Sequence, residues 1–170
     1  MTIADGMQGK ISRHDFSGSF VMLKFFRGKA SATVLRLAQS PLFAGLSTGA
    51  LKTVENMMHL RHYLAGEVIF DEGEEGQALY VIVSGSVLIC HPGQQTDPIA
   101  ELGPGSHFGE LALLDDAPRS AQARAHTECE LAVFFRGDFE RLLESHARIA
   151  SRIALQLARI LGQRLRSKVA

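Results

Sequence analysis

FGELALLDDAPRSA, at residues 108–121, is the most informative stretch of the sequence. After its glycine, residues 110–114 can form one or two helical turns, and a helix start leaves several backbone N–H groups unpaired. Such N–H groups favour an anion in front of them. Pro118 prevents the helix from continuing. Arg119 then brings a planar guanidinium with several donors to the same place. The stretch therefore predicts a phosphate-binding loop.

Glu110 is the unusual member of this loop, because a carboxylate beside a phosphate repels it unless the carboxylate points elsewhere. An ionised carboxylate only accepts hydrogen bonds, and a sugar hydroxyl is a natural donor to it. We therefore expect Glu110 to contact a hydroxyl group of the molecule that carries the phosphate.

The stretch resembles the phosphate-binding cassette of cyclic nucleotide-binding domains. That family has Phe-Gly-Glu, an aliphatic residue, Ala-Leu, a variable gap, and then Pro-Arg-Ser/Thr/Ala-Ala. Only residues 114–117 of this chain fall in the gap, and every other position agrees with the pattern. A match of this length is more specific than a single glycine motif. Residues 108–121 are called the cassette below.

The resemblance implies that the ligand is cAMP or cGMP and that no further cofactor is needed. It implies that Arg119, the Ser120 hydroxyl and backbone amides hold the cyclic phosphate. Glu110 would accept a hydrogen bond from the ribose 2′-OH. The ligand-binding residues implied in this way are Gly109, Glu110, Leu111, Ala112, Arg119, Ser120 and Ala121.

A length of 170 residues fits one domain that has helical attachments. The 18 basic and 18 acidic residues balance, so the whole protein has no general attraction for nucleic acid. The distribution is uneven, since residues 41–135 hold 4 basic and 13 acidic residues. An anion site in this acidic part depends on local donors, which increases the importance of Arg119.

The segments around the cassette predict a mainly β protein. Short runs rich in Val, Ile and Tyr, separated by glycines and acidic turns, are typical of a closed or sandwiched sheet. The resemblance makes this a β-roll with N-terminal helices and two C-terminal helices. The expected strands cover residues 66–70, 78–84, 86–90, 99–102, 120–126 and 130–135.

Helices are expected on both sides of the β-roll. One covers residues 30–40, and a second follows the N-cap Ser47 to about Leu60. A third runs from Phe139 to about Ser145 with Asp138 as its N-cap, and the last runs from about Ala147 to Lys168, weakened at Gly162. These elements give an N-terminal extension (1–40), a helix with the β-roll core (41–137) and C-terminal helices (138–170).

The last helix carries an apolar stripe that includes Ile153, Leu157 and Ile160. The sequence leaves open what covers this stripe. It packs on the barrel of the same chain, closes as a lid over the nucleotide base, or forms the seam of a homodimer. The three residues named are the lid candidates.

Several other functions are excluded or disfavoured. Ser120 has no histidine partner for catalysis, so we do not expect an enzyme. His107 and Glu110 lie three residues apart and His91 lies elsewhere, but there is no His-x-His pair, and a divalent metal site normally gathers three or more ligands, so no metal site is expected. Cys90 and Cys129 are expected to be free buried thiols. No run of about 20 apolar residues and no secretion signal is present, so a cytoplasmic protein is expected.

The sequence therefore predicts a regulatory domain that senses a cyclic nucleotide and signals to an unidentified protein partner through movement of its C-terminal helix. The helix predicted to reach Lys168 leaves no room for a DNA-reading module, so direct DNA binding is not expected. The alternative is a β-roll interaction module that does not need nucleotide.

Overall fold

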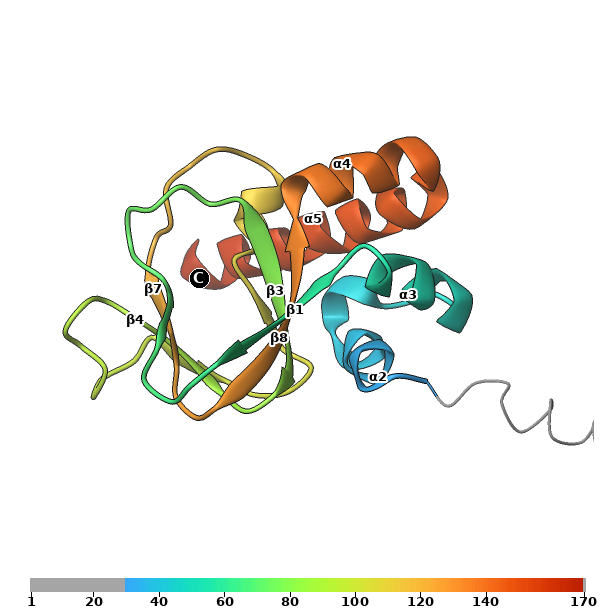
Figure 1. Cartoon of the computed structure of the whole chain (residues 1–170). Helices are drawn as coiled ribbons and strands as arrows, with labels where there is room; N and C mark the ends of the chain where they lie inside the picture. The colour runs from blue at the N-terminus through green and yellow to red at the C-terminus, as the bar shows by residue number, and fades with distance from the viewer. Residues whose placement is uncertain (1–29, 170) are drawn as a thin grey trace, which may run out of the picture.

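The computed structural model describes residues 30–169, which form two four-stranded antiparallel sheets flanked by helices (Figure 1). The first sheet has the order β1 (His59–Tyr63), β8 (Cys129–Phe135), β3 (Ala78–Ser84), β6 (His107–Phe108). The second has the order β2 (Val68–Phe70), β7 (Gln122–Ala125), β4 (Val87–Cys90), β5 (Ala100–Leu102). This arrangement, with the helices that follow, confirms the predicted β-roll.

The helices lie before and after the sheets in the chain, apart from one short turn inside the cassette. They are α2 (Ala32–Gln39), η1 (Pro41–Phe43), α3 (Thr48–Glu55), η2 (Glu110–Leu113), α4 (Arg136–Ser145) and α5 (Ala147–Val169). Ser47 is the N-cap of α3, as predicted, and its side chain accepts from the Ala50 N–H. Residues 1–29, which make up most of the predicted N-terminal extension, lie outside the described residues.

The predicted end of the second helix was wrong. Helix α3 stops at Glu55, and Leu60 belongs to β1, which pairs with β8 at the edge of the first sheet. Four of the five β1 side chains are exposed, so the strand lacks the alternation of apolar and polar residues that would have indicated it. The very short β6 was missed as well.

The start of the third helix also differs from the prediction. Helix α4 begins at Arg136, its N-cap is Phe135, and no side chain caps it. Asp138 lies in the first turn, where its buried carboxylate is paired with Arg141 and lies 3.3 Å from His59 Nε2. Helix α5 continues through Gly162 to Val169 without a break.

Two clusters of buried side chains hold these layers together. The smaller one includes Ile82, Phe108 and Leu131, and it contains the buried free thiol of Cys129; Cys90 is also buried and free, as predicted. The larger one packs the first sheet against the helices, with fully buried members such as Leu79, Phe134, Leu37, Phe43, Leu142, Ile153 and Leu157.

Helix α5 is fixed to the N-terminal helices along its first half. Ile153 and Leu157 are buried in the larger cluster. Arg152 donates to the Gly45 carbonyl at 2.7 Å, just after η1. Because these contacts fix the direction of the helix, its later turns pass beside the cassette. In the described part of the chain, no helix is both long and apolar enough to cross a bilayer.

Candidate functional site

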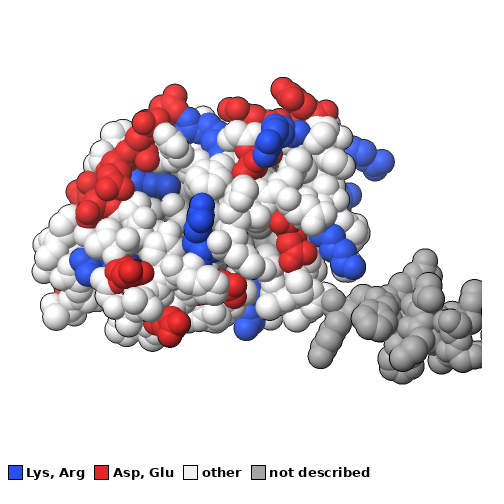
Figure 2. All heavy atoms as spheres, viewed as in Figure 1, with Lys and Arg blue, Asp and Glu red and all other residues white. Residues whose placement is uncertain are grey.

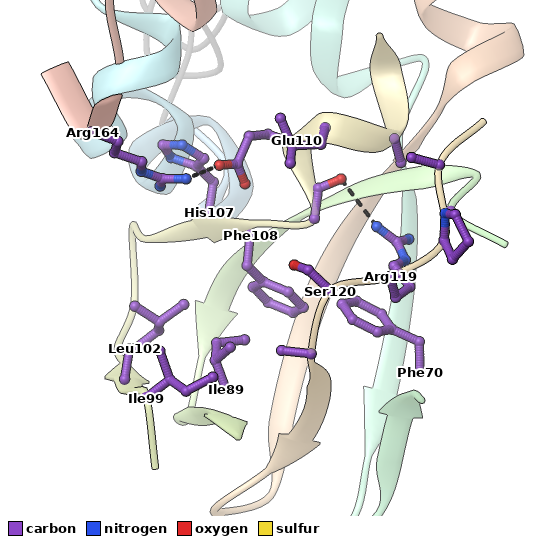
Figure 3. A pocket seen from close by; sticks show the side chains of 18 of the residues that line it. Phe70, Ile89, Ile99, Leu102, His107, Phe108, Glu110, Arg119, Ser120 and Arg164 are labelled. Atoms are coloured by element: carbon purple, nitrogen blue, oxygen red, sulfur yellow. Dashed lines mark hydrogen bonds and ion pairs between the residues drawn. The ribbon is translucent and has the colours of Figure 1, made fainter. Parts of the chain in front are cut away.

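A cavity of about 430 Å³ lies between the second sheet, the cassette and α5 (Figure 3). Every cassette residue predicted to bind the ligand lines it: Gly109, Glu110, Leu111, Ala112, Arg119, Ser120 and Ala121. The structure therefore brings the predicted residues together around one space. The cavity also has an apolar wall, formed by Phe70, Ile89, Ile99, Leu102 and Phe108.

Two glycines make room for the arginine of the cassette. Gly109 has φ of 73°, and a Cβ there would lie 2.7 Å from Nη1 of Arg119 and 3.1 Å from the Ala78 carbonyl oxygen. Only glycine adopts this left-handed conformation readily and leaves that space. A Cβ at Gly76 would lie 3.1 Å from the Ala112 Cβ and 3.4 Å from the guanidinium carbon of Arg119.

Arg119 is held rigidly in this space and is only 9% exposed. Its Nη1 donates to the Gly109 carbonyl at 3.1 Å and its Nη2 to the Ala78 carbonyl at 2.9 Å. The guanidinium carbon lies 4.1 Å from the centre of the Phe70 ring, a cation–π contact. Burial lowers the pKa of Arg119 from its ordinary value, although a guanidinium stays charged in proteins.

The Nε of Arg119 is buried and, among the described residues, has no hydrogen-bond partner. Buried N–H groups are rarely left in this state, and an anion in the cavity would provide the acceptor. The surroundings add no long-range attraction for that anion. Figure 2 shows acidic side chains gathered along the edge of the molecule where the loop from β2 to β3 lies in Figure 1. An anion in the cavity would therefore depend on the local donors of the cassette.

Glu110 is buried, with 4% of its surface exposed, and its carboxylate is paired with Arg164 of α5 (Figure 3). A buried carboxylate needs a counter-charge or hydrogen bonds, and Arg164 provides both. Figure 3 shows Arg164 and Arg119 on opposite sides of the site, with Arg164 on the left beside Glu110 and Arg119 on the right. The site therefore consists of one cation inside the cassette and one carboxylate that is tied to the last helix.

The model of the cyclic nucleotide-binding domain family matches residues 60–146, just over half of the chain. The chain belongs to this family. The resemblance predicted from the cassette is thereby confirmed.

Relatives with assigned roles come from several kinds of regulatory protein. The cyclic AMP receptor protein of Thermus thermophilus is 41% identical over 126 residues, covering 73% of this chain and 58% of that protein. A cAMP-dependent protein kinase regulatory subunit of Emericella nidulans is 37% identical over 107 residues, covering 63% of this chain and 26% of that protein. The crystal structure of the Thermus thermophilus catabolite activator protein has a TM-score of 0.68 and 40% identity, covering 76% of this chain and 60% of that one.

This cyclic nucleotide-binding domain thus spans less than two thirds of either curated relative. The family match at residues 60–146 extends over the strands and the cassette. The activities of these longer relatives are therefore not assigned to this chain.

The lid candidates of the domain do not line the cavity in this structure. Ile153 and Leu157 are buried in the larger core cluster, and Ile160 is partly buried against it. The residue by which α5 reaches the cavity is Arg164. It follows Leu157 and Ile160 at spacings of seven and four, so it continues the same helical face. A charged residue on a buried stripe was the signal that could have identified it.

His107 is a second polar residue of the cavity that the cassette motif does not include. Its Nδ1 lies 3.0 Å from Ser40 Oγ, and its Nε2 is buried without a partner among the described residues. Burial lowers the pKa of the imidazole and Arg164 acts in the same direction, while Glu110 opposes them. The lowered pKa favours the neutral form of the His107 imidazole. Within residues 30–169, no three potential ligands group together in a metal site.

Proposed function

We propose that this domain is a sensor that binds a cyclic nucleotide, cAMP or cGMP, and signals through the C-terminal helix α5. One observation supports this most directly. A single cavity contains the cassette arginine Arg119, the buried acceptor Glu110 and, paired with Glu110, the α5 residue Arg164. Any ligand that fills the cavity contacts both the anion site and the residue that connects it to α5.

The proposed position of the ligand follows from the polarity of the cavity. The cyclic phosphate lies against Arg119, Ser120 and the first turn of η2, and the ribose 2′-OH donates to Glu110. The base lies against the apolar wall. The Ala112 N–H already donates to the Gly109 carbonyl at 3.2 Å. The free donors of the first turn are therefore expected nearer its start, at Gly109 and Leu111.

The names of the relatives support the ligand class. Both curated relatives are named for cyclic AMP or for dependence on cAMP. cAMP is therefore the first nucleotide to test, and cGMP is the matched comparison. They differ in the base, whereas the cassette contacts the phosphate and the ribose that they share.

The path of the signal is proposed from the way in which α5 is attached. Its first half is fixed by Arg152, Ile153 and Leu157, whereas Leu165 is 66% exposed and Val169 80%. A ribose hydroxyl bound to Glu110 changes the surroundings of Arg164 and hence the position of these last turns. The ligand shifts this equilibrium only by the difference between its affinities for the two arrangements. A partner protein would recognise the changed end of the helix.

The second candidate is an interaction module that does not need nucleotide. The observation that favours it is that Arg119 and Glu110 already have partners inside the chain. Isothermal titration and thermal melting with cAMP and with cGMP distinguish the two functions. Ligand at about 100 times its dissociation constant stabilises the folded state by about 2.7 kcal/mol. If neither nucleotide releases heat nor shifts the melting temperature, the interaction module is the better description.

A further inference from the structure

Arg136, the first residue of α4, makes a set of contacts with the cassette that the motif does not include. Its Nε donates to the Ala112 carbonyl at 2.6 Å. Its Nη2 donates to the carbonyls of Gly76 at 2.6 Å and Asp115 at 2.5 Å, and its Nη1 is paired with the Asp116 carboxylate. One guanidinium thus joins the loop between β2 and β3, the end of η2 and the start of α4.

These contacts occur at the end of η2, where backbone carbonyls lack hydrogen-bond donors within the helix. The last carbonyls of any helix lack partners within it, and η2 has only four residues. A cation at a helix C-terminus also interacts favourably with the helix dipole. Arg136 provides both the donors and the charge, and its side chain is only 21% exposed. The shape of η2 therefore depends on a residue outside the cassette.

The loop that Arg136 holds through Gly76 also supports Arg119. The Arg119 N–H donates to the Glu74 carbonyl at 2.7 Å, and the Gly73 N–H donates to the Arg119 carbonyl at 2.9 Å. Gly76 lies against both the Arg119 guanidinium and Ala112, because a Cβ on Gly76 would come within 3.4 Å of the guanidinium carbon and 3.1 Å of the Ala112 Cβ. By binding the carbonyls of Gly76 and Ala112 at once, Arg136 fixes η2 and the loop between β2 and β3 relative to each other beside Arg119.

We propose that Arg136 is a positioning residue for the anion site. It keeps η2 and the loop between β2 and β3 at the separation that directs Arg119 and the first N–H groups of η2 into the cavity. The inference rests on the proposed function for its effect on ligand affinity. Because Arg136 also begins α4, and α4 packs against α5, the same contacts connect the cassette to the C-terminal helices.

The test compares three substitutions by isothermal titration with cAMP and with cGMP. Arg136→Lys keeps a cation but lacks the planar fork whose Nε and Nη2 reach three separate carbonyls, and it is expected to weaken binding by about tenfold or more. Asp116→Asn removes the ion pair and keeps the carbonyl contacts, and it is expected to change affinity by less than about threefold. Arg141→Lys is the matched control on α4, because Arg141 is paired with one carboxylate, that of Asp138.

Amide hydrogen exchange of residues 110–114 in the folded proteins gives a readout that does not need a ligand. Faster exchange there in Arg136→Lys, with unchanged exchange in β8, supports the positioning role. Wild-type exchange in residues 110–114, or wild-type affinity in Arg136→Lys, overturns it. If the wild-type protein binds neither nucleotide, the proposed function fails, and the exchange measurement alone decides the role of Arg136.

Discussion

Removing Arg164 tests the connection between the cavity and α5. In Arg164→Ala, the Glu110 carboxylate, 4% exposed, loses its counter-charge. Breaking a fully buried pair destabilises a protein by about 3 to 5 kcal/mol. The Arg164 side chain is 55% exposed, so solvent screens part of this interaction. We therefore expect a loss of about 1 to 2 kcal/mol in the free energy of unfolding, between the values for exposed and buried pairs.

The double substitution Arg164→Ala/Glu110→Gln gives the decisive result, because the effect of Glu110→Gln on the free energy of unfolding changes sign when Arg164 is removed. In the wild-type background, Glu110→Gln removes a paired charge and destabilises the protein. In the Arg164→Ala background, the same change replaces an unpaired buried carboxylate by a neutral amide and restores stability. Urea unfolding of the four proteins measures the coupling energy. Arg159→Ala is the control, because Arg159 is exposed on α5 and makes no ion pair in the described residues. A coupling below about 0.3 kcal/mol would refute the connection.

Three further predictions concern the cavity. Arg119→Lys, which lacks the planar fork, is expected to lower nucleotide affinity by about ten- to a hundredfold in isothermal titration, and unchanged affinity contradicts the assigned phosphate site. Gly109→Ala forces a side chain into a positive φ against Arg119 and is expected to lower stability by about 1 to 3 kcal/mol. Gly162→Ala at a half-buried position of α5, where a Cβ would make only an ordinary contact with Arg166 Nη1 at 3.5 Å, is expected to raise stability by up to about 1 kcal/mol. Equal melting temperatures of the two variants contradict this. The third concerns pH. Because the pKa of His107 is lowered in the folded state, the unfolded chain binds more protons below about pH 6.5. His107 therefore makes the protein less stable as pH falls from that value, by at most about 1.4 kcal/mol per pH unit. His107→Gln should reduce this loss between pH 7.5 and 5.5 in urea unfolding, and an identical loss in both proteins argues against it.

The parts of the fold that could be predicted from the sequence are those with strong local patterns. The Val- and Ile-rich strands β3 and β4, the N-cap Ser47 and the periodic helix α5 were all predicted close to their observed bounds. β1 was missed because an edge strand with exposed side chains carries no apolar alternation. The start of α4 was misplaced because Asp138 has the residue type of an N-cap, although its carboxylate pairs with Arg141 instead.

In the candidate site, too, the residues that could be predicted are those that a local pattern identifies. The motif indicated the cassette residues that line the cavity, because they are close together in the sequence. Arg164 and Arg136 lie 54 and 24 residues from the cassette residues that they contact, Glu110 and Ala112. Their positions depend on how α4 and α5 pack, which local patterns do not specify. The apolar wall was not identified because its residues resemble those of any buried strand.

The pairing of Arg164 with Glu110 and the proximity of Ser40 to His107 have a consequence for how this domain is delimited. The family model matches residues 60–146, a range that contains the whole cassette. Both of these partners lie outside that range, one before it and one after it. A fragment cut to the matched range would keep the motif but expose a buried carboxylate and an imidazole. The unit that assembles the cavity is therefore longer than the range that the family model matches.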